Sequence, residues 1–272
     1  MESFFTFLEK RVDDTSSLLC VGLDPHISDL DSPNATSALK FCLNLVKQTA
    51  RYASAFKPNA AFFEVFGAEG WTVLKQVVES VKEESDKQDS RIPVVLDAKR
   101  GDISSTSDAY AESAFGTLGV DCITLSPYLG KDSIDPFIKN SEKGAFVLCK
   151  TSNPGSGDLQ DVTVNGNEPL YIHVAKLAQT WNKKNNVGLV VGATHTEAMK
   201  KIREVVPNMW FLAPGVGTQG GDLETAMQAG LRKDGKGMLI PVSRAISRAN
   251  NPAKAAADLR DEMLSYRQNL TR

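Results

Sequence analysis

The stretch Val94-Val95-Leu96-Asp97-Ala98-Lys99-Arg100-Gly101-Asp102-Ile103 runs from an apolar segment directly into a group of charged residues. Such an apolar run predicts a buried strand. Charges are costly to bury unless they pair, and the two-residue repeat of a strand places Asp97 and Lys99 on one face. Carboxylates crowded around an ammonium at a strand end are typical of a functional site. A buried ion-pair network that only holds the strand tip is the structural alternative.

Seven further apolar segments resemble this strand, and helical periodicity separates them. The eight predicted strands are 18–24, 55–63, 92–99, 122–127, 145–151, 187–193, 209–217 and 237–246. Helical spacing of apolar residues is clearest over 37–52, 71–81 and 168–181. Repeated strand–helix alternation without a domain break predicts a (β/α)8 TIM barrel, with residues 1–272 as one domain. A doubly wound parallel sheet is the competing fold.

Composition excludes several classes of protein. The chain has 272 residues, 42% of them hydrophobic, and a formal net charge of -2, which implies no strong field for nucleic acid or for a membrane. No apolar run approaches the roughly 18 residues that span a bilayer, and the N-terminus lacks a secretory pattern. The four cysteines are scattered, which indicates buried thiols in a reducing compartment, and we expect a cytoplasmic location. The three histidines share no metal-ligand spacing.

Polar residues end most of the predicted strands. In barrels of this kind the active site lies at the carboxyl ends of the strands, so these residues are the candidates for a site. They are Asp24, Lys57, Asp97, Lys99, Ser126, Thr151, Ser152, Pro214, Gln219 and Arg244. Lys57 lies between apolar residues and needs a carboxylate partner, which Asp97 or Asp24 can supply. The polar segment 153–169 follows the fifth strand and is interpreted equally well as a lid or as a tolerated insertion.

A glycine-rich segment, 213–222, follows the seventh strand and indicates an anion site. Successive backbone N–H groups in such a turn bind phosphate, and Arg244 adds a guanidinium suited to the same group. The segment also contains a literal G-x-G-x-x-G at Gly215, Gly217 and Gly220, with Asp234 at about the spacing of a dinucleotide site. We reject that interpretation because Asp234 precedes a strand instead of ending one.

The stretch 97–103 resembles the signature of orotidine 5′-phosphate decarboxylases, in the subgroup with Arg-Gly between the lysine and the second aspartate. Segments 21–25, 56–59, 124–128, 150–154, 214–221 and 242–244 resemble the family's segments in the same order. The resemblance implies a barrel that converts orotidine monophosphate (OMP) to uridine monophosphate (UMP) and carbon dioxide, without metal or organic cofactor. It also implies a homodimer with active sites at the subunit interface. Fusion to orotate phosphoribosyltransferase, known in some lineages, stays open, as does a targeting segment beyond the chain.

The resemblance also implies a role for individual residues. Lys57, Asp97, Lys99 and Asp102 match the family's charged tetrad. Asp102 and Thr106 match positions that reach into the neighbouring subunit's site. Asp24 matches a ribose contact shared with Lys57, and Ser152 matches a contact to the pyrimidine amide edge. Gln219 and Arg244 match residues that bind the substrate phosphate, and Pro214 matches a residue that lines the pocket. Ser126 is expected to be structural.

The same residues suit decarboxylation on chemical grounds alone. Loss of carbon dioxide from an sp2 carbon leaves a carbanion, which the ammonium of Lys99 can stabilise and then protonate. Asp97 would face the substrate carboxylate and favour its departure. Two rival interpretations stay open. One is another phosphate-binding barrel enzyme, such as a sugar-phosphate decarboxylase, an epimerase or a Schiff-base aldolase. The other is a barrel that binds a nucleotide as a structural or regulatory partner.

Overall fold

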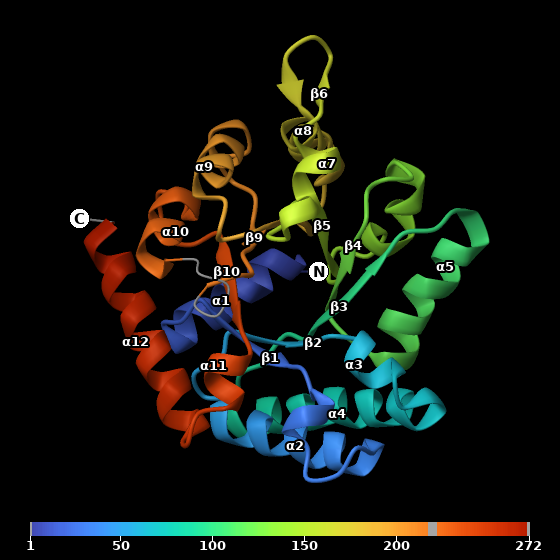
Figure 1. The fold of residues 1–272 in the computed structure, drawn as a ribbon, viewed down its shortest axis with the longest axis vertical. Helices are drawn as coiled ribbons and strands as arrows, with labels where there is room; N and C mark the ends of the chain where they lie inside the picture. The colour runs from blue at the N-terminus through green and yellow to red at the C-terminus, as the bar shows by residue number, and fades with distance from the viewer. Residues whose placement is uncertain (1, 217–221, 271–272) are drawn as a thin grey trace.

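A computed structural model describes residues 2–216 and 222–270 of the chain, and these form a barrel of parallel strands (Figure 1). The eight strands of the barrel lie in the order β2-β1-β10-β9-β8-β5-β4-β3. Their bounds are β1 Leu19–Leu23, β2 Ala55–Pro58, β3 Val95–Arg100, β4 Cys122–Leu125, β5 Gly144–Lys150, β8 Val187–Val191, β9 Phe211–Leu212 and β10 Met238–Val242. The end strands meet through single bridges, Phe56 with Val94 and Asn59 with Asp97. The predicted (β/α)8 barrel is therefore confirmed.

Helices surround the strands and bury their apolar faces against them. They are α1 Phe4–Thr15, α2 Ala35–Thr49, α3 Ala61–Glu64, α4 Gly67–Gln88, α5 Ser104–Glu112, α6 Asp135–Ile138, α7 Gly157–Gln160, α8 Leu170–Trp181, α9 Thr196–Val205, α10 Leu223–Gly230, α11 Arg244–Ser247 and α12 Pro252–Leu270, with a π-helical turn at Ser113–Leu118 and 3-10 turns at Ile27–Asp29, Lys131–Ser133 and Pro154–Ser156. In α4 the residues Val73, Leu74, Val77, Val78 and Val81 are buried, as a one-sided helix requires. None of the helices in the described ranges is both long and apolar enough to cross a bilayer.

The predicted strands run too long at their carboxyl ends. The second ends at Pro58 instead of residue 63, because Ala61–Glu64 turn into α3. The last ends at Val242, and Arg244 begins the short helix α11 instead of ending a strand. In both cases apolar residues beyond the strand pack under a helical turn, so hydrophobicity continues after the extended backbone has ended. Part of the predicted seventh strand, Gly217, lies outside the described residues.

The segment after β5 is more ordered than the predicted loop. Residues 153–169 contain the turn Pro154–Ser156, helix α7, and an antiparallel hairpin of β6, Thr163–Val164, with β7, Glu168–Pro169. The hairpin projects at the top of Figure 1, beyond the ring of helices. The predicted helix from residue 168 begins only at Leu170, because Glu168 and Pro169 pair in the hairpin.

Helix α1, which no sequence pattern led us to expect, covers the amino-terminal end of the barrel. Phe5 stacks on Trp210 and meets Phe146 edge-on, with ring centroids 5.8 and 5.5 Å apart. Gly144 opens β5 under the ring of Phe4, where a Cβ atom would lie 2.3 Å from a ring carbon. Helix α1 therefore packs across the amino-terminal end of the barrel, opposite the carboxyl ends of the strands.

A buried arginine fixes α1 to the rest of the molecule. Arg11 is only 2% exposed. Its guanidinium donates to the carbonyl oxygens of Ala50, at 2.7 Å, and Ala53, at 3.0 and 3.1 Å. It also donates to the hydroxyl of Ser90 at 2.9 Å. These acceptors lie at the end of α2 and after α4, so one side chain connects three helices.

We expect Arg11→Ala to lower the free energy of unfolding by about 2–4 kcal/mol, because buried carbonyl acceptors lose their donor. The matched control is Lys10→Ala. The Lys10 side chain is 68% exposed and forms a surface ion pair with Glu2, so its loss should change stability by less than about 1 kcal/mol. Urea denaturation measures both. Equal stability of the two variants would contradict the structural role of Arg11.

Candidate active site

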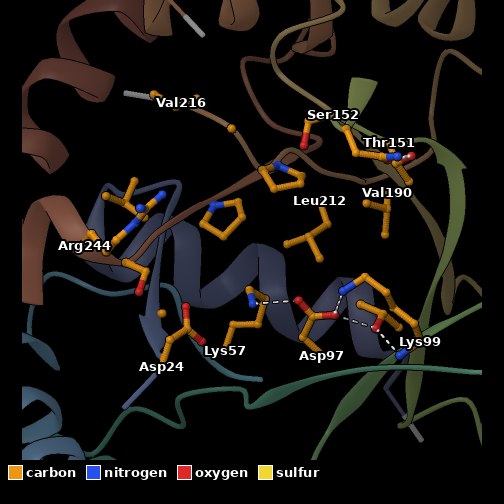
Figure 2. Close-up of a pocket in the computed structure, with 18 of the residues that line it drawn as sticks. Asp24, Lys57, Asp97, Lys99, Thr151, Ser152, Val190, Leu212, Val216 and Arg244 are labelled. Carbon is orange, nitrogen blue, oxygen red and sulfur yellow. Dashed lines mark hydrogen bonds and ion pairs between the residues drawn. The ribbon is translucent and has the colours of Figure 1, made fainter. Parts of the chain in front are cut away.

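A cavity of about 680 Å³ opens at the carboxyl ends of the strands, within the size range of small-molecule sites. Residues from six strand ends line it: Asp24, Lys57, Asp97, Lys99, Thr151, Ser152, Pro214 and Arg244. Figure 2 shows Asp24, Lys57, Asp97 and Lys99 along one side, with Thr151 and Ser152 across from Lys99 and Arg244 at the opposite end. The residues that sequence reasoning collected from distant segments therefore share one cavity. Among the described residues, no His, Cys, Asp and Glu side chains are grouped to hold a metal ion.

One carboxylate lies between two ammonium groups. Asp97 Oδ2 accepts from Lys57 Nζ at 2.9 Å, and Asp97 Oδ1 accepts from Lys99 Nζ at 2.6 Å. The side chains of Lys57 and Asp97 are only 9% and 13% exposed, whereas that of Lys99 is 50% exposed. Lys57 and Asp97 thus form a buried pair, and Lys99 extends from it into the open part of the cavity.

Thr124 on β4 holds the carboxylate from below. Its Oγ1 donates to Asp97 Oδ1 at 3.0 Å and accepts from the backbone N–H groups of Ala98, at 3.1 Å, and Lys99, at 2.9 Å. The hydroxyl therefore satisfies two backbone donors that no strand partner reaches. It also limits how far the Asp97 side chain can rotate.

The end of β3 is irregular, and the irregularity places Lys99. The pairing of β3 with β4 shifts register between Leu96 and Arg100. Lys99 has a φ of 48°, a left-handed conformation that is uncommon for a residue with a side chain. Such backbone strain persists only where the surroundings impose it, and it gathers at functional sites. Simple strand alternation predicted the correct face for Lys99, but the observed backbone is a bulge.

The electrostatics of the buried pair favour the charged forms of both partners. Burial alone would lower the pKa of Lys57, but the charges of Asp24 and Asp97 outweigh burial and raise it above its usual range. Burial alone would raise the pKa of Asp97, but Lys57 and Lys99 hold it well below its usual range. At neutral pH the cavity therefore contains the carboxylate of Asp97 beside the ammonium of Lys57.

The opposite end of the cavity suits an anion and polar hydroxyl groups. Arg244 lies there beside Pro214 and Gly215, at the end of β9. Asp24 Oδ1 and Ser243 Oγ are buried without a hydrogen-bond partner among the described residues. Both flank Gly22, where a Cβ atom would lie 2.7 Å from Ser243 Cβ, so the backbone approach requires glycine. Orphaned buried oxygens beside a cavity indicate that a ligand completes their hydrogen bonds. Gln219, predicted for the same end, lies outside the described residues.

Two predicted site residues do not line the cavity of their own chain. Asp102 follows β3, and its Oδ1 accepts from the N–H of Ile103 at 2.8 Å. Thr106 lies in the first turn of α5 and is exposed. Neither residue is among those that line the cavity.

The geometry agrees with a comparison of the sequence with protein-family models. The model described as "Orotidine 5'-phosphate decarboxylase / HUMPS family" matches residues 17–259. The chain belongs to this family. The match covers every strand of the barrel and all residues described above as lining the cavity.

Relatives of the orotidine 5'-phosphate decarboxylase family extend along nearly the whole chain. An orotidine 5'-phosphate decarboxylase of Roseiflexus castenholzii is 47% identical over 262 residues, which is 95% of this chain and 93% of the relative. The solved structure of Leishmania donovani OMP decarboxylase has a TM-score of 0.88 and 49% identity, covering 98% of this chain and 99% of that one. Leishmania donovani UMP synthase has a TM-score of 0.90 and 51% identity, but this chain, 98% of it covered, spans only 57% of that protein.

Several residues that line the cavity had no role predicted from the sequence or from the resemblance to the family. Thr124, Asn153 and Ser243 lie in segments that resemble the family but have no role predicted from the sequence, and Gln160 lies outside those segments. All four line the cavity. Thr124 could have been found as a hydroxyl among the apolar residues of β4. Gln160 gives no such signal, because only the fold of the segment after β5 brings it back to the strand end.

The ion pair predicts an acid-dependent contribution to stability. Because the folded state lowers the pKa of Asp97, the contribution is present above the unfolded value near 4 and is lost as the pH falls toward the folded value. We therefore expect wild type to be more stable than Asp97→Asn at pH 7, with the difference shrinking below about pH 4. Urea denaturation across this pH range measures it. A difference that stays constant from pH 7 to pH 3 would be inconsistent with the ionised pair.

Proposed function

We propose that this protein decarboxylates orotidine 5′-monophosphate to uridine 5′-monophosphate and carbon dioxide, the last step of pyrimidine nucleotide synthesis. The observation that carries the proposal is the Lys57–Asp97–Lys99 array in a cavity whose other end holds Arg244. The names of its relatives support the same substrate. A metal-dependent epimerase or a Schiff-base aldolase gives no reason for a carboxylate fixed between two ammonium groups.

The positions of the charged and polar groups in the cavity suggest how the substrate is oriented. Its phosphate would bind Arg244 and the backbone around Pro214, with Gln219 completing the grip. The ribose hydroxyls would satisfy the orphaned oxygen of Asp24 together with Lys57. Ser152 would contact the amide edge of the pyrimidine. This orientation puts the C6 carboxylate of the base at Asp97 and Lys99, on the side of the cavity where both are held.

In the reaction the bond between C6 and the carboxyl carbon breaks, carbon dioxide leaves, and the electron pair stays on C6. The ammonium of Lys99 stabilises this developing charge and then donates a proton to C6, which gives UMP. Lys99 regains its proton from solvent, and its half-exposed side chain supports this exchange. Atoms balance as OMP plus one proton giving UMP plus carbon dioxide.

Asp97 would act by its fixed negative charge. Thr124 and two lysines hold the carboxylate in place, and its lowered pKa keeps it ionised. A substrate carboxylate brought against it is repelled, and this repulsion is relieved when carbon dioxide leaves. Binding energy from the distant phosphate would offset the unfavourable contact.

We expect Lys99→Ala to lower kcat by at least about 10⁴-fold, because it removes both the charge stabilisation and the proton donor. The decrease of OMP absorbance in the ultraviolet measures turnover. Lys131→Ala, which removes an exposed surface ion pair with Asp135, is the control and should retain wild-type activity. A Lys99→Ala variant with one-tenth of wild-type turnover would refute the assigned role.

We also propose that the active enzyme is a homodimer in which Asp102 and Thr106 complete the neighbouring subunit's site. Apolar side chains around the end of β3 support a second copy as the partner. Val65, Ile103, Tyr128 and Leu129 are 62%, 53%, 78% and 46% exposed. Arg100 lies between α3 and α5: it forms an ion pair with Glu64 at 2.9 Å and packs on the Tyr110 ring. Exposed apolar groups beside polar site residues are typical of an interface.

A shared site predicts complementation between two inactive variants. Lys99→Ala and Asp102→Ala should each be nearly inactive as homodimers. In a randomly mixed population half of the dimers contain one intact site, so we expect about a quarter of wild-type turnover to return. Mixing after mild dissociation, with the ultraviolet assay, measures it. Mixed samples no more active than the separate variants would exclude a site built from two subunits.

Three further expectations belong to the same proposal. The continuous core supports a single domain over residues 1–272. The four free, buried cysteines support a cytoplasmic, reducing location. The likeness to part of UMP synthase supports an association with orotate phosphoribosyltransferase, fused or separate.

A further inference from the structure

At the rim of the cavity beyond β5, three polar side chains are joined by hydrogen bonds, and one backbone donor orients the Gln160 amide. Gln160 Oε1 accepts from the backbone N–H of Thr151 at 2.9 Å, and Gln160 Nε2 donates to Thr151 Oγ1 at 2.8 Å. Thr151 Oγ1 in turn donates to Asn153 Oδ1 at 2.7 Å. A backbone N–H can only donate, so it fixes which atom of the Gln160 amide is oxygen, and Gln160 Nε2 is therefore the donor to Thr151 Oγ1.

With these hydrogen bonds formed, the Gln160 and Asn153 amides have N–H groups left for a ligand. Gln160 Nε2 has two hydrogens and uses one on Thr151, and Asn153 Nδ2 uses neither. Among the described residues, neither nitrogen makes a further hydrogen bond, and both side chains line the cavity. A rim of N–H donors matches a ligand edge that carries carbonyl oxygen, and it opposes an edge that carries an amino group.

Contacts of Lys150 outside the cavity hold helix α7, which carries Gln160, in place. Lys150, only 3% exposed, ends β5 and points away from the cavity. Its Nζ donates to Asp161 Oδ1 at 2.8 Å and to Ser156 Oγ at 3.2 Å. Gln160 directly precedes Asp161, so this buried contact fixes helix α7 against the strand end. The Gln160 amide is thus positioned before any ligand binds.

The position of the rim points to one atom of the base. In a pyrimidine nucleotide C4 lies across the ring from N1, which carries the ribose. If the sugar phosphate extends toward Arg244, C4 faces the opposite end of the cavity, where Figure 2 shows Thr151 and Ser152. We propose that Gln160, oriented by Thr151, donates its remaining N–H to the C4 carbonyl of the pyrimidine and thereby selects uracil over cytosine nucleotides. This inference rests on the function proposed above.

The test is the ratio of affinities for UMP and CMP, which differ at C4 and N3 but share the ribose phosphate. Calorimetric titration of the full-length protein should show UMP binding at least about tenfold tighter, as one matched and one opposed hydrogen bond require. Gln160→Glu keeps an acceptor for Thr151 but replaces the free donor by an acceptor. It should lower the UMP-to-CMP affinity ratio at least about tenfold. Ribose 5-phosphate, which lacks the base, should lose little affinity by comparison.

Two further variants separate this contact from general effects. Gln179→Glu introduces the same charge on an exposed face of α8 and should leave the ratio unchanged. Thr151→Val removes the hydroxyl that orients Gln160, adds no charge, and should lower the ratio in the same direction.

Each outcome has a distinct meaning. Wild type that binds CMP as tightly as UMP, or a ratio unchanged in both Gln160→Glu and Thr151→Val, would overturn the role of Gln160. Wild type that binds neither UMP nor ribose 5-phosphate and does not consume OMP would overturn the proposed function itself.

Discussion

The structure depends on a single carboxylate, Asp97, shared by two lysines. Lys57 could not be buried in the barrel without a partner, because an unpaired ammonium in a dry site is strongly unfavourable. With Asp97 at 2.9 Å and Asp24 nearby, its pKa rises instead of falling. The same carboxylate holds Lys99 at 2.6 Å, where half of that side chain remains open to the cavity. One negative charge therefore permits both a buried cation and an accessible one.

The barrel supports this arrangement by bringing short strand ends to one place. Thr124 comes from β4 and Lys57 from β2, and both contact the Asp97 carboxylate within β3. The closure of the barrel between β2 and β3 includes the bridge of Asn59 with Asp97, so the interaction that closes the sheet also positions the charged array. At the other end, helix α1 packs across the barrel, and Arg11 fixes this helix in place.

The cavity is chemically polarised along its length. Arg244 and two orphaned oxygens mark the end suited to a sugar phosphate. The donors of Gln160 and Asn153 mark the end suited to a carbonyl edge, and the charged array lies along one side. A ligand with an anionic tail, hydroxyl groups and a carbonyl-bearing ring meets a complementary group at each position. This order of groups, more than any single residue, distinguishes the site from that of a generic phosphate-binding barrel.

The sequence by itself determined the strand–helix repeat, the barrel and the group of strand-end residues, because hydrophobic periodicity and isolated charges are local properties. It also placed Asp97 and Lys99 on one face. It did not determine where strands stop, as the helical turn after Pro58 and the helix beginning at Arg244 demonstrate, because apolar residues pack equally well under either backbone. Only the tertiary structure decided that Thr124 supports Asp97, that Lys99 takes a left-handed φ, and that Gln160 returns to Thr151. Those contacts join residues whose proximity arises from barrel closure and from the fold of one inserted segment, and no local pattern encodes either.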